Sequence, residues 1–128
     1  MLGWDAKRIL TKINYKIHTD AIQSHLVVPH LLTHKEATLA YATEADVLNM
    51  ALYGMTARQW KDKNPKLAGN IRDYSDVTQL VCLANLESLN AEFIRQGLPQ
   101  SDRLLRLNEI AIAQMQSLAG NCSIKKLR

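Results

Sequence analysis

The stretch that decides the fold is residues 75–97, SDVTQLVCLANLESLNAEFIRQG, followed after the short link LPQ by residues 101–120, SDRLLRLNEIAIAQMQSLAG. Both segments begin with Ser-Asp, which can cap the first turn of a helix, and both end at a glycine, which favours helix C-termini. Their apolar residues recur every three or four positions, as they do along one face of a helix. Because the link is short, we predict an antiparallel helical hairpin over residues 76–119.

Helical spacing also extends through the N-terminal residues 4–26, which contain no glycine or proline. Ile9, Ile13 and Ile17 recur at four-residue steps and therefore share one stripe of a helix. Pro29 ends this pattern, because the residue before a proline is pushed out of helical geometry. We predict one long helix, or a pair of helices, over residues 4–26.

Three helix starts are expected in the middle of the chain. A hydroxyl residue followed three positions later by a carboxylate or carboxamide is typical of a capping box. The pattern occurs at Thr33 with Glu36, at Thr43 with Asp46 and at Thr56 with Gln59. It predicts short helices over about residues 34–63, and the charged, unpatterned residues 64–74 that follow are predicted to form a surface loop. Residues 120–128 are a polar, basic tail.

The fold class follows from these patterns. No segment alternates apolar and polar residues as a strand does, so we predict a single all-α domain with five or six helices. A chain of 128 residues, 47% of them hydrophobic, can bury a core without disulfides or a metal. No apolar run approaches the ~20 residues that cross a bilayer. The two cysteines, Cys82 and Cys122, come without an export signal, which indicates a cytoplasmic protein with reduced thiols and no membrane attachment.

Sequence patterns of catalysis and cofactor binding are absent. The chain contains no nucleophile elbow, no phosphate-binding glycine loop and no dinucleotide fingerprint. His18 and His25, and likewise His30 and His34, are spaced so that each pair could share a helix face, but no cysteine or acidic residue completes a ligand set. We therefore predict no catalytic residues, no metal site and no cofactor, and we interpret the chain as non-enzymatic.

Positive charge gathers around a tryptophan in residues 58–72. Cations interleaved with an aromatic side chain suit contact with phosphates and bases. The alternative is a solvated loop whose tryptophan turns inward as a core anchor. The net charge is only +4, so we expect weak nucleic-acid binding from this domain alone. The candidate contact residues are Arg58, Trp60, Lys61, Lys63, Lys66 and Arg72.

Several strings of the chain, taken in order, resemble one protein family. They are KINYKIHTDAI at residues 12–22, ATEADVLNMALYGMTARQW at 42–60 and GNIRDY at 69–74, continued by LANLESLNA at 83–91, RQGLPQS at 95–101 and LNEIA at 107–111. Together they resemble the C-terminal region of bacterial and phage KilA-N-domain proteins. The resemblance covers about residues 4–118.

This resemblance implies a mobile-element or prophage origin and a DNA-linked context. In that family a KilA-N DNA-binding module precedes this region, and the 128 residues do not include it. The chain is therefore expected to be either a fragment or the product of a small gene. No catalytic residue carries over from the family. The string at residues 69–74 directs attention to that loop and adds Asn70 to the candidate contacts.

The expected function is that of an accessory domain of a DNA-binding protein, used for oligomerisation or contact with a partner protein. The alternative is a direct, weak nucleic-acid-binding module centred on the basic stretch 58–72. An exposed apolar patch would favour the first hypothesis, whereas basic side chains gathered on one surface would favour the second.

Overall fold

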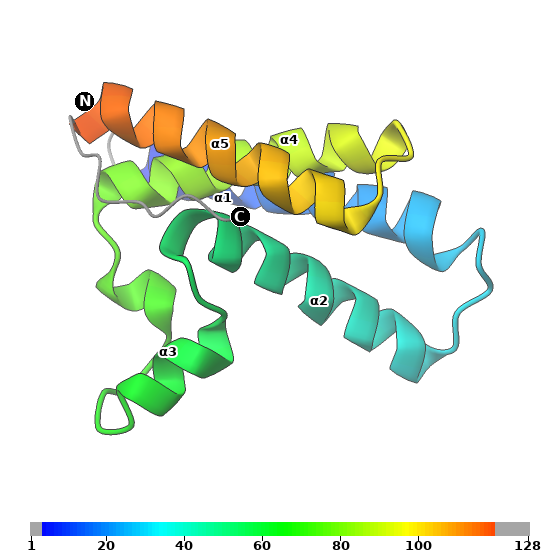
Figure 1. Cartoon of the computed structure of the whole chain (residues 1–128), viewed down its shortest axis with the longest axis horizontal. Helices are drawn as coiled ribbons and strands as arrows, with labels where there is room; N and C mark the ends of the chain where they lie inside the picture. The colour runs from blue at the N-terminus through cyan, green and yellow to red at the C-terminus, as the bar shows by residue number, and fades with distance from the viewer. Residues whose placement is uncertain (1–3, 120–128) are drawn as a thin grey trace.

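The computed structural model describes residues 4–119, of which about 80% are helical and none lies in a β-strand. The prediction of an all-α fold is therefore confirmed. Five α-helices follow one another along the chain (Figure 1): α1 Trp4–Ile22, α2 His34–Tyr53, α3 Ala57–Lys63, α4 Val77–Arg95 and α5 Gln100–Ala119. A π-helical turn, η1 (Gln23–Val27), extends α1, and a 3-10 turn, η2 (Ile71–Tyr74), precedes α4. None of the described helices is long and apolar enough to cross a membrane.

Helix α4 occupies the centre of the fold. It packs against α1 on one side and α5 on the other, and α2 runs beneath this layer with its main contacts to α5 and α4 (Figure 1). The main core lies where α2, α4 and α5 meet. Its large buried side chains include Leu48, Leu52, Leu83, Leu86, Leu107 and Met115.

Helices α4 and α5 run in opposite directions. Residues 96–99 reverse the chain, and Gly97 adopts a positive φ of 78° that favours glycine. Near the reversal Arg103 donates a hydrogen bond to Asn90, and far from it Asn85 donates one to Gln114. These two pairings place both helices side by side over most of their length.

Helix α1 packs on α4 through a face other than its isoleucine stripe. Ala21 and Ile22 join Ala91 and Ile94 of α4 in a second, smaller core. Ile9, Ile13 and Ile17 remain 57%, 50% and 43% exposed. The periodic stripe predicted from the sequence exists, but no described element covers it.

Residues 34–53 form one helix, which corrects the prediction of several short helices over 34–63. Thr43 is not a cap: it lies inside α2, and its hydroxyl donates to the carbonyl oxygen of Leu39 at 2.8 Å. With no glycine or proline between residues 34 and 53, nothing interrupts the helix before Gly54, whose φ is 74°. Thr33 and Thr56 do form the predicted capping boxes.

The starts of the last two helices also differ from the prediction. Asp76, not Ser75, caps α4, and the Ser75 hydroxyl instead donates to the carbonyl oxygen of Ile71. Helix α5 begins at Gln100, so Ser101 lies within its first turn. The predicted loop over 64–74 contains the turn η2, and the predicted tail 120–128 lies outside the described residues.

The two threonines give a matched test of the capping assignment. Thr33→Ala should lower the free energy of unfolding by about 1 kcal/mol, because the backbone N–H of Glu36 loses its acceptor. Thr43→Ala should leave stability nearly unchanged, because alanine favours a helix interior and the lost bond is local. Urea denaturation of both variants measures the difference. Equal losses would contradict the assignment.

Candidate interaction site

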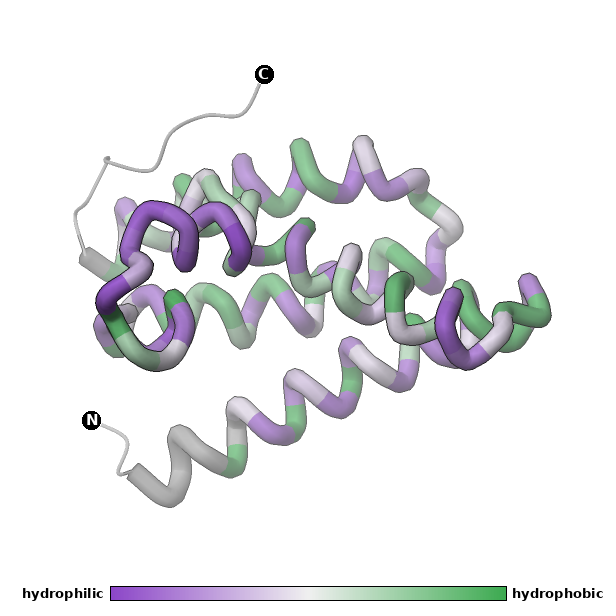
Figure 2. The backbone as a smooth tube through the Cα atoms, turned by 90° about the horizontal axis from the view of Figure 1, so that it is seen from below, coloured by the Kyte–Doolittle hydropathy of each residue, from purple (hydrophilic) through white to green (hydrophobic). Residues whose placement is uncertain are grey.

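The stretch 58–72 forms a lobe that projects from the helical layers (Figure 1) and is largely hydrophilic (Figure 2). The whole lobe is residues 57–74, which comprise α3, the following loop and η2. Four of the predicted contact residues, Arg58, Lys61, Lys63 and Lys66, are exposed on it. The Lys61 ammonium donates to the carbonyl oxygen of Leu67, so this cation also holds the loop against α3.

Asn70, the candidate taken from the family resemblance, has a local structural role. Its side chain accepts the backbone N–H of Arg72 at 2.9 Å, while its own N–H donates to Asp73 at 2.8 Å. Gly69 has a φ of 86°, and a Cβ there would lie 2.3 Å from a carboxylate oxygen of Asp73. The residues of the string GNIRDY therefore stabilise the turn that they form.

Arg72 is separated from the other four cations by its burial. It is half-buried, and its charge acts on three groups of the helical layers: Glu87, His18 and Tyr53. A half-buried guanidinium is less accessible to a phosphate than the side chains of the four exposed cations. The lobe therefore presents four of the five predicted cations to solvent.

Trp60 is half-buried and stacks against Tyr74, with ring centroids 5.2 Å apart and planes tilted by 33°. The sequence left open whether this tryptophan is a core anchor or a stacking surface. Trp60 is neither a fully buried core anchor nor a fully exposed stacking surface. It is half-buried against the ring of Tyr74, which is itself 53% exposed.

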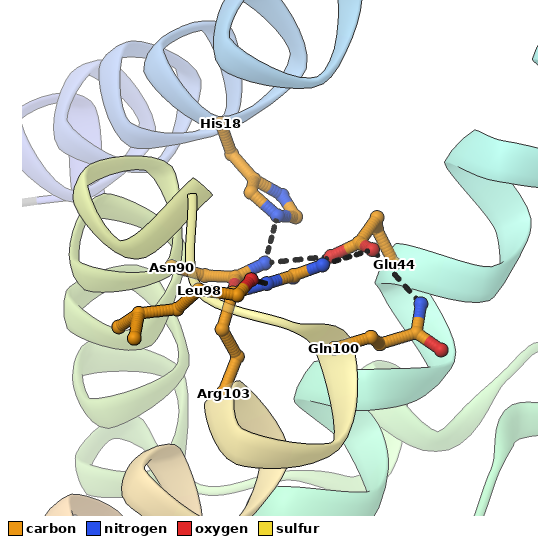
Figure 3. Close-up of polar contacts among 6 residues, drawn as sticks. All are labelled: His18, Glu44, Asn90, Leu98, Gln100 and Arg103. Atoms are coloured by element: carbon orange, nitrogen blue, oxygen red, sulfur yellow. Dashed lines mark hydrogen bonds and ion pairs between the residues drawn. The ribbon is translucent and has the colours of Figure 1, made fainter. Parts of the chain in front are cut away.

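A buried polar cluster joins four helices (Figure 3). Glu44 of α2 and Arg103 of α5 form an ion pair in which each side chain is 3% exposed. Arg103 Nη2 donates to Glu44 Oε2 at 3.0 Å, and Nη1 donates to Oε1. The Arg103 Nε donates to the carbonyl oxygen of Leu98 at 3.0 Å, and Gln100 donates to Glu44 at 2.9 Å.

Asn90 links this ion pair to α1. Its amide nitrogen donates to Glu44 Oε1 at 3.0 Å and to His18 Nε2 at 2.8 Å, while its oxygen accepts from Arg103. His18 Nε2 is therefore an acceptor and the ring is neutral. Burial, which the nearby Arg103 reinforces, lowers the pKa of His18 to about 4.

Burial acts to raise the pKa of Glu44, but hydrogen bonds from Arg103, Asn90 and Gln100 outweigh burial and lower the pKa. Glu44 is thus a buried carboxylate. In the sequence, His18 is marked only by its spacing from His25, and no pattern distinguishes Asn90 or Arg103. A usable signal was present: Glu44 shares helical spacing with the apolar Val47, Leu48 and Ala51.

Two further ionisable groups are buried in α4. Glu87 is 2% exposed, and burial raises its pKa to about 7, against the opposing charge of Arg72. Cys82 is fully buried, and burial raises the pKa of its thiol to about 11. Within residues 4–119, no group of three His, Cys, Asp or Glu side chains is arranged to hold a metal ion.

One side of the α1–α4–α5 layer is not covered by α2. Helix α1 runs parallel to α4, with His18 opposite Asn90 and with Ile22 packed near Ile94. This register places Ile9 level with Val81 of α4, and Ile13 and Ile17 one and two turns further along. We call this surface the open face. It consists of Ile9, Ile13, Ile17, Val77, Leu80 and Val81, which are 37–57% exposed.

Comparison with known proteins found no match to this chain among protein-family models, curated proteins or solved structures.

The ion pair leads to a stability prediction. Arg103→Met should lower the free energy of unfolding by about 3–5 kcal/mol, because it leaves the Glu44 carboxylate buried without its partner. Arg106→Met is the matched control: Arg106 is exposed and only stacks over Phe93 at 5.8 Å, so its loss should cost less than about 1 kcal/mol. Urea denaturation at neutral pH compares the two. Similar costs would contradict the role of the pair.

Glu87 should make stability depend on pH. Its pKa is about 7 when folded and near 4.5 when unfolded, so the folded protein loses stability as pH rises through this window. Glu87→Gln should remove about 3 kcal/mol of that loss in the free energy of unfolding. The measurement is the difference in unfolding free energy between variant and parent at pH 8, compared with the same difference at pH 4. Glu92→Gln, at an exposed neighbour, is the control. A pH-independent difference would disprove the assignment.

Proposed function

We propose that this chain is a non-enzymatic accessory domain of a mobile-element or prophage DNA-binding protein, located in the cytoplasm, and that it acts by self-association through the open face. The main support for the proposal is the exposure of two isoleucines. Ile13 and Ile17 are 50% and 43% exposed although they lie on a regular apolar stripe. Exposed apolar patches of this kind mark protein–protein contact sites.

The geometry of the stripe suits a helix as its counterpart. Residues at four-residue steps form a ridge, and two such ridges pack into each other's grooves at about −50°. A second copy of the chain offers the same ridge, so a two-fold axis through Ile13 would make the contact self-complementary. The sedimentation experiment described below distinguishes this self-association from contact with a different protein.

The resemblance to KilA-N-domain proteins supplies the biological context of this proposal. In that family the DNA-binding module precedes this region, and a self-associating domain would bring two such modules together. Two linked modules bind DNA more tightly than one because the second binds at a high effective concentration. The enclosed polar cluster and the enclosed Cys82 thiol favour a structural role over a catalytic one.

Sedimentation equilibrium tests the proposal. The average mass should rise with concentration between about 1 µM and about 1 mM, the range in which weak dimers form. Ile13→Glu should weaken the dimer at least about tenfold, because it places a charge in an apolar contact. Leu39→Glu is the matched control, since Leu39 is 67% exposed on α2 and lies outside the open face.

A constant monomeric mass over the whole range would disprove self-association and leave contact with a different protein. Equal effects of both glutamates would show that the open face is not the contact surface.

A further inference from the structure

The projecting lobe contains a pocket of about 220 Å³ that does not belong to the open face. It lies between α3, η2 and the end of α2. Its walls are mostly aromatic and apolar, and its lining includes Tyr53, Met55, Trp60, Ile71, Tyr74 and Gln79. Aromatic walls with one carboxamide and the Ser75 hydroxyl suit a planar, polar ring more than an aliphatic chain.

A hydrogen bond holds the Tyr74 ring in place, and the Trp60 ring stacks against it with centroids 5.2 Å apart. The Tyr74 hydroxyl donates to the carbonyl oxygen of Ala68 at 2.7 Å. The side chain of Asn64 donates to the carbonyl oxygen of Trp60 at 2.9 Å, which secures the end of α3. Fixed, partly exposed rings can stack on a ligand without losing much conformational entropy.

Gln79 provides directional hydrogen bonding at the pocket. Its carboxamide oxygen accepts the backbone N–H of Asp76 at 2.9 Å, which fixes the orientation of the group. The amide N–H groups are then the donors that the side chain can offer to a ligand. Such donors suit the ring nitrogens and carbonyl oxygens at the edge of a nucleobase.

The charges of α3 are arranged asymmetrically around the pocket. Lys63 lies three residues after Trp60 and so on the same side of the helix. Arg58 and Asp62 are two residues from Trp60 in either direction and so lie on the opposite side. Lys66 follows in the exposed loop. Lys63 is therefore the α3 cation that lies on the same side as the aromatic pair, and the carboxylate of Asp73, next to Tyr74, accepts the backbone N–H of Asn70 at 2.8 Å.

We propose that this pocket binds one unstacked base of a single-stranded nucleic acid, with the base against Trp60 and Tyr74 and an adjoining phosphate on Lys63. A base within a duplex is stacked on both faces and cannot enter a side pocket unless it is flipped out. The seven residues of α3 span about 10 Å, which limits the contact to about three nucleotides. Binding is therefore weak and sensitive to salt.

Fluorescence anisotropy at low salt tests the proposal with labelled oligothymidylate, oligouridylate and a duplex, each of about 12 nucleotides. One or both single strands should bind more tightly than the duplex, and the two single strands together show whether DNA or RNA is preferred. Tyr74→Leu should weaken binding at least about fivefold, because it removes a stacking face. Tyr74→Phe keeps the ring and should bind nearly as well as the parent.

Two cations give a matched test of the phosphate contact. Lys63→Ala should reduce the slope of log affinity against log salt by about 0.7, the value for one phosphate on a single strand. Arg58→Ala removes the same charge from the opposite side of α3 and should leave the slope unchanged. Equal reductions would show diffuse attraction to the lobe and would overturn the proposed geometry.

Intrinsic fluorescence provides a measurement that does not depend on the stability of a Tyr74 variant. In a Trp4→Phe protein Trp60 is the sole tryptophan, and a stacked base should quench its emission. Absence of binding, preference for the duplex, or binding without quenching would each overturn the proposal.

Discussion

The buried ion pair between Glu44 and Arg103 is the interaction on which the arrangement of the helices depends. Burying two charged groups costs desolvation free energy. This cost is offset only where the two groups are close together and their remaining polar atoms have hydrogen-bond partners. Here Asn90, Gln100 and the Leu98 carbonyl supply those partners. They come from α4, from the start of α5 and from the link between them, so the pair specifies how α2, α4 and α5 align.

The same cluster determines which face of α1 is buried. Asn90 has one amide hydrogen left after its bond to Glu44, and His18 accepts it. The face of α1 that carries His18, Ala21 and Ile22 therefore turns inward, and the stripe of Ile9, Ile13 and Ile17 turns toward solvent. The apolar open face is thus a consequence of satisfying a buried polar group.

The projecting lobe is organised by different forces. Its backbone is held by capping boxes at Thr56 and Asn70 and by the contact of Lys61 with the Leu67 carbonyl, all of them local. Ile71, which is buried, and the half-buried Arg72 connect it to the helical layers. The open face and the lobe are therefore separate surfaces, one apolar and one aromatic and basic. This separation is why we propose a different partner for each surface, a second copy of the chain for the first and a single-stranded nucleic acid for the second.

Local sequence patterns were sufficient to predict the helical class and the caps at Thr33 and Thr56, because these depend on residues within four positions of each other. They did not predict that residues 34–53 form a single long helix. They also did not distinguish the true caps from Thr43 and Ser75, whose hydroxyls find other local acceptors. Which stripe of α1 is buried, and which carboxylates are buried, depends on how the helices pack together. Those outcomes depend on pairs such as Glu44 with Arg103 and His18 with Asn90, which are 59 and 72 residues apart. No local periodicity encodes a contact at that separation.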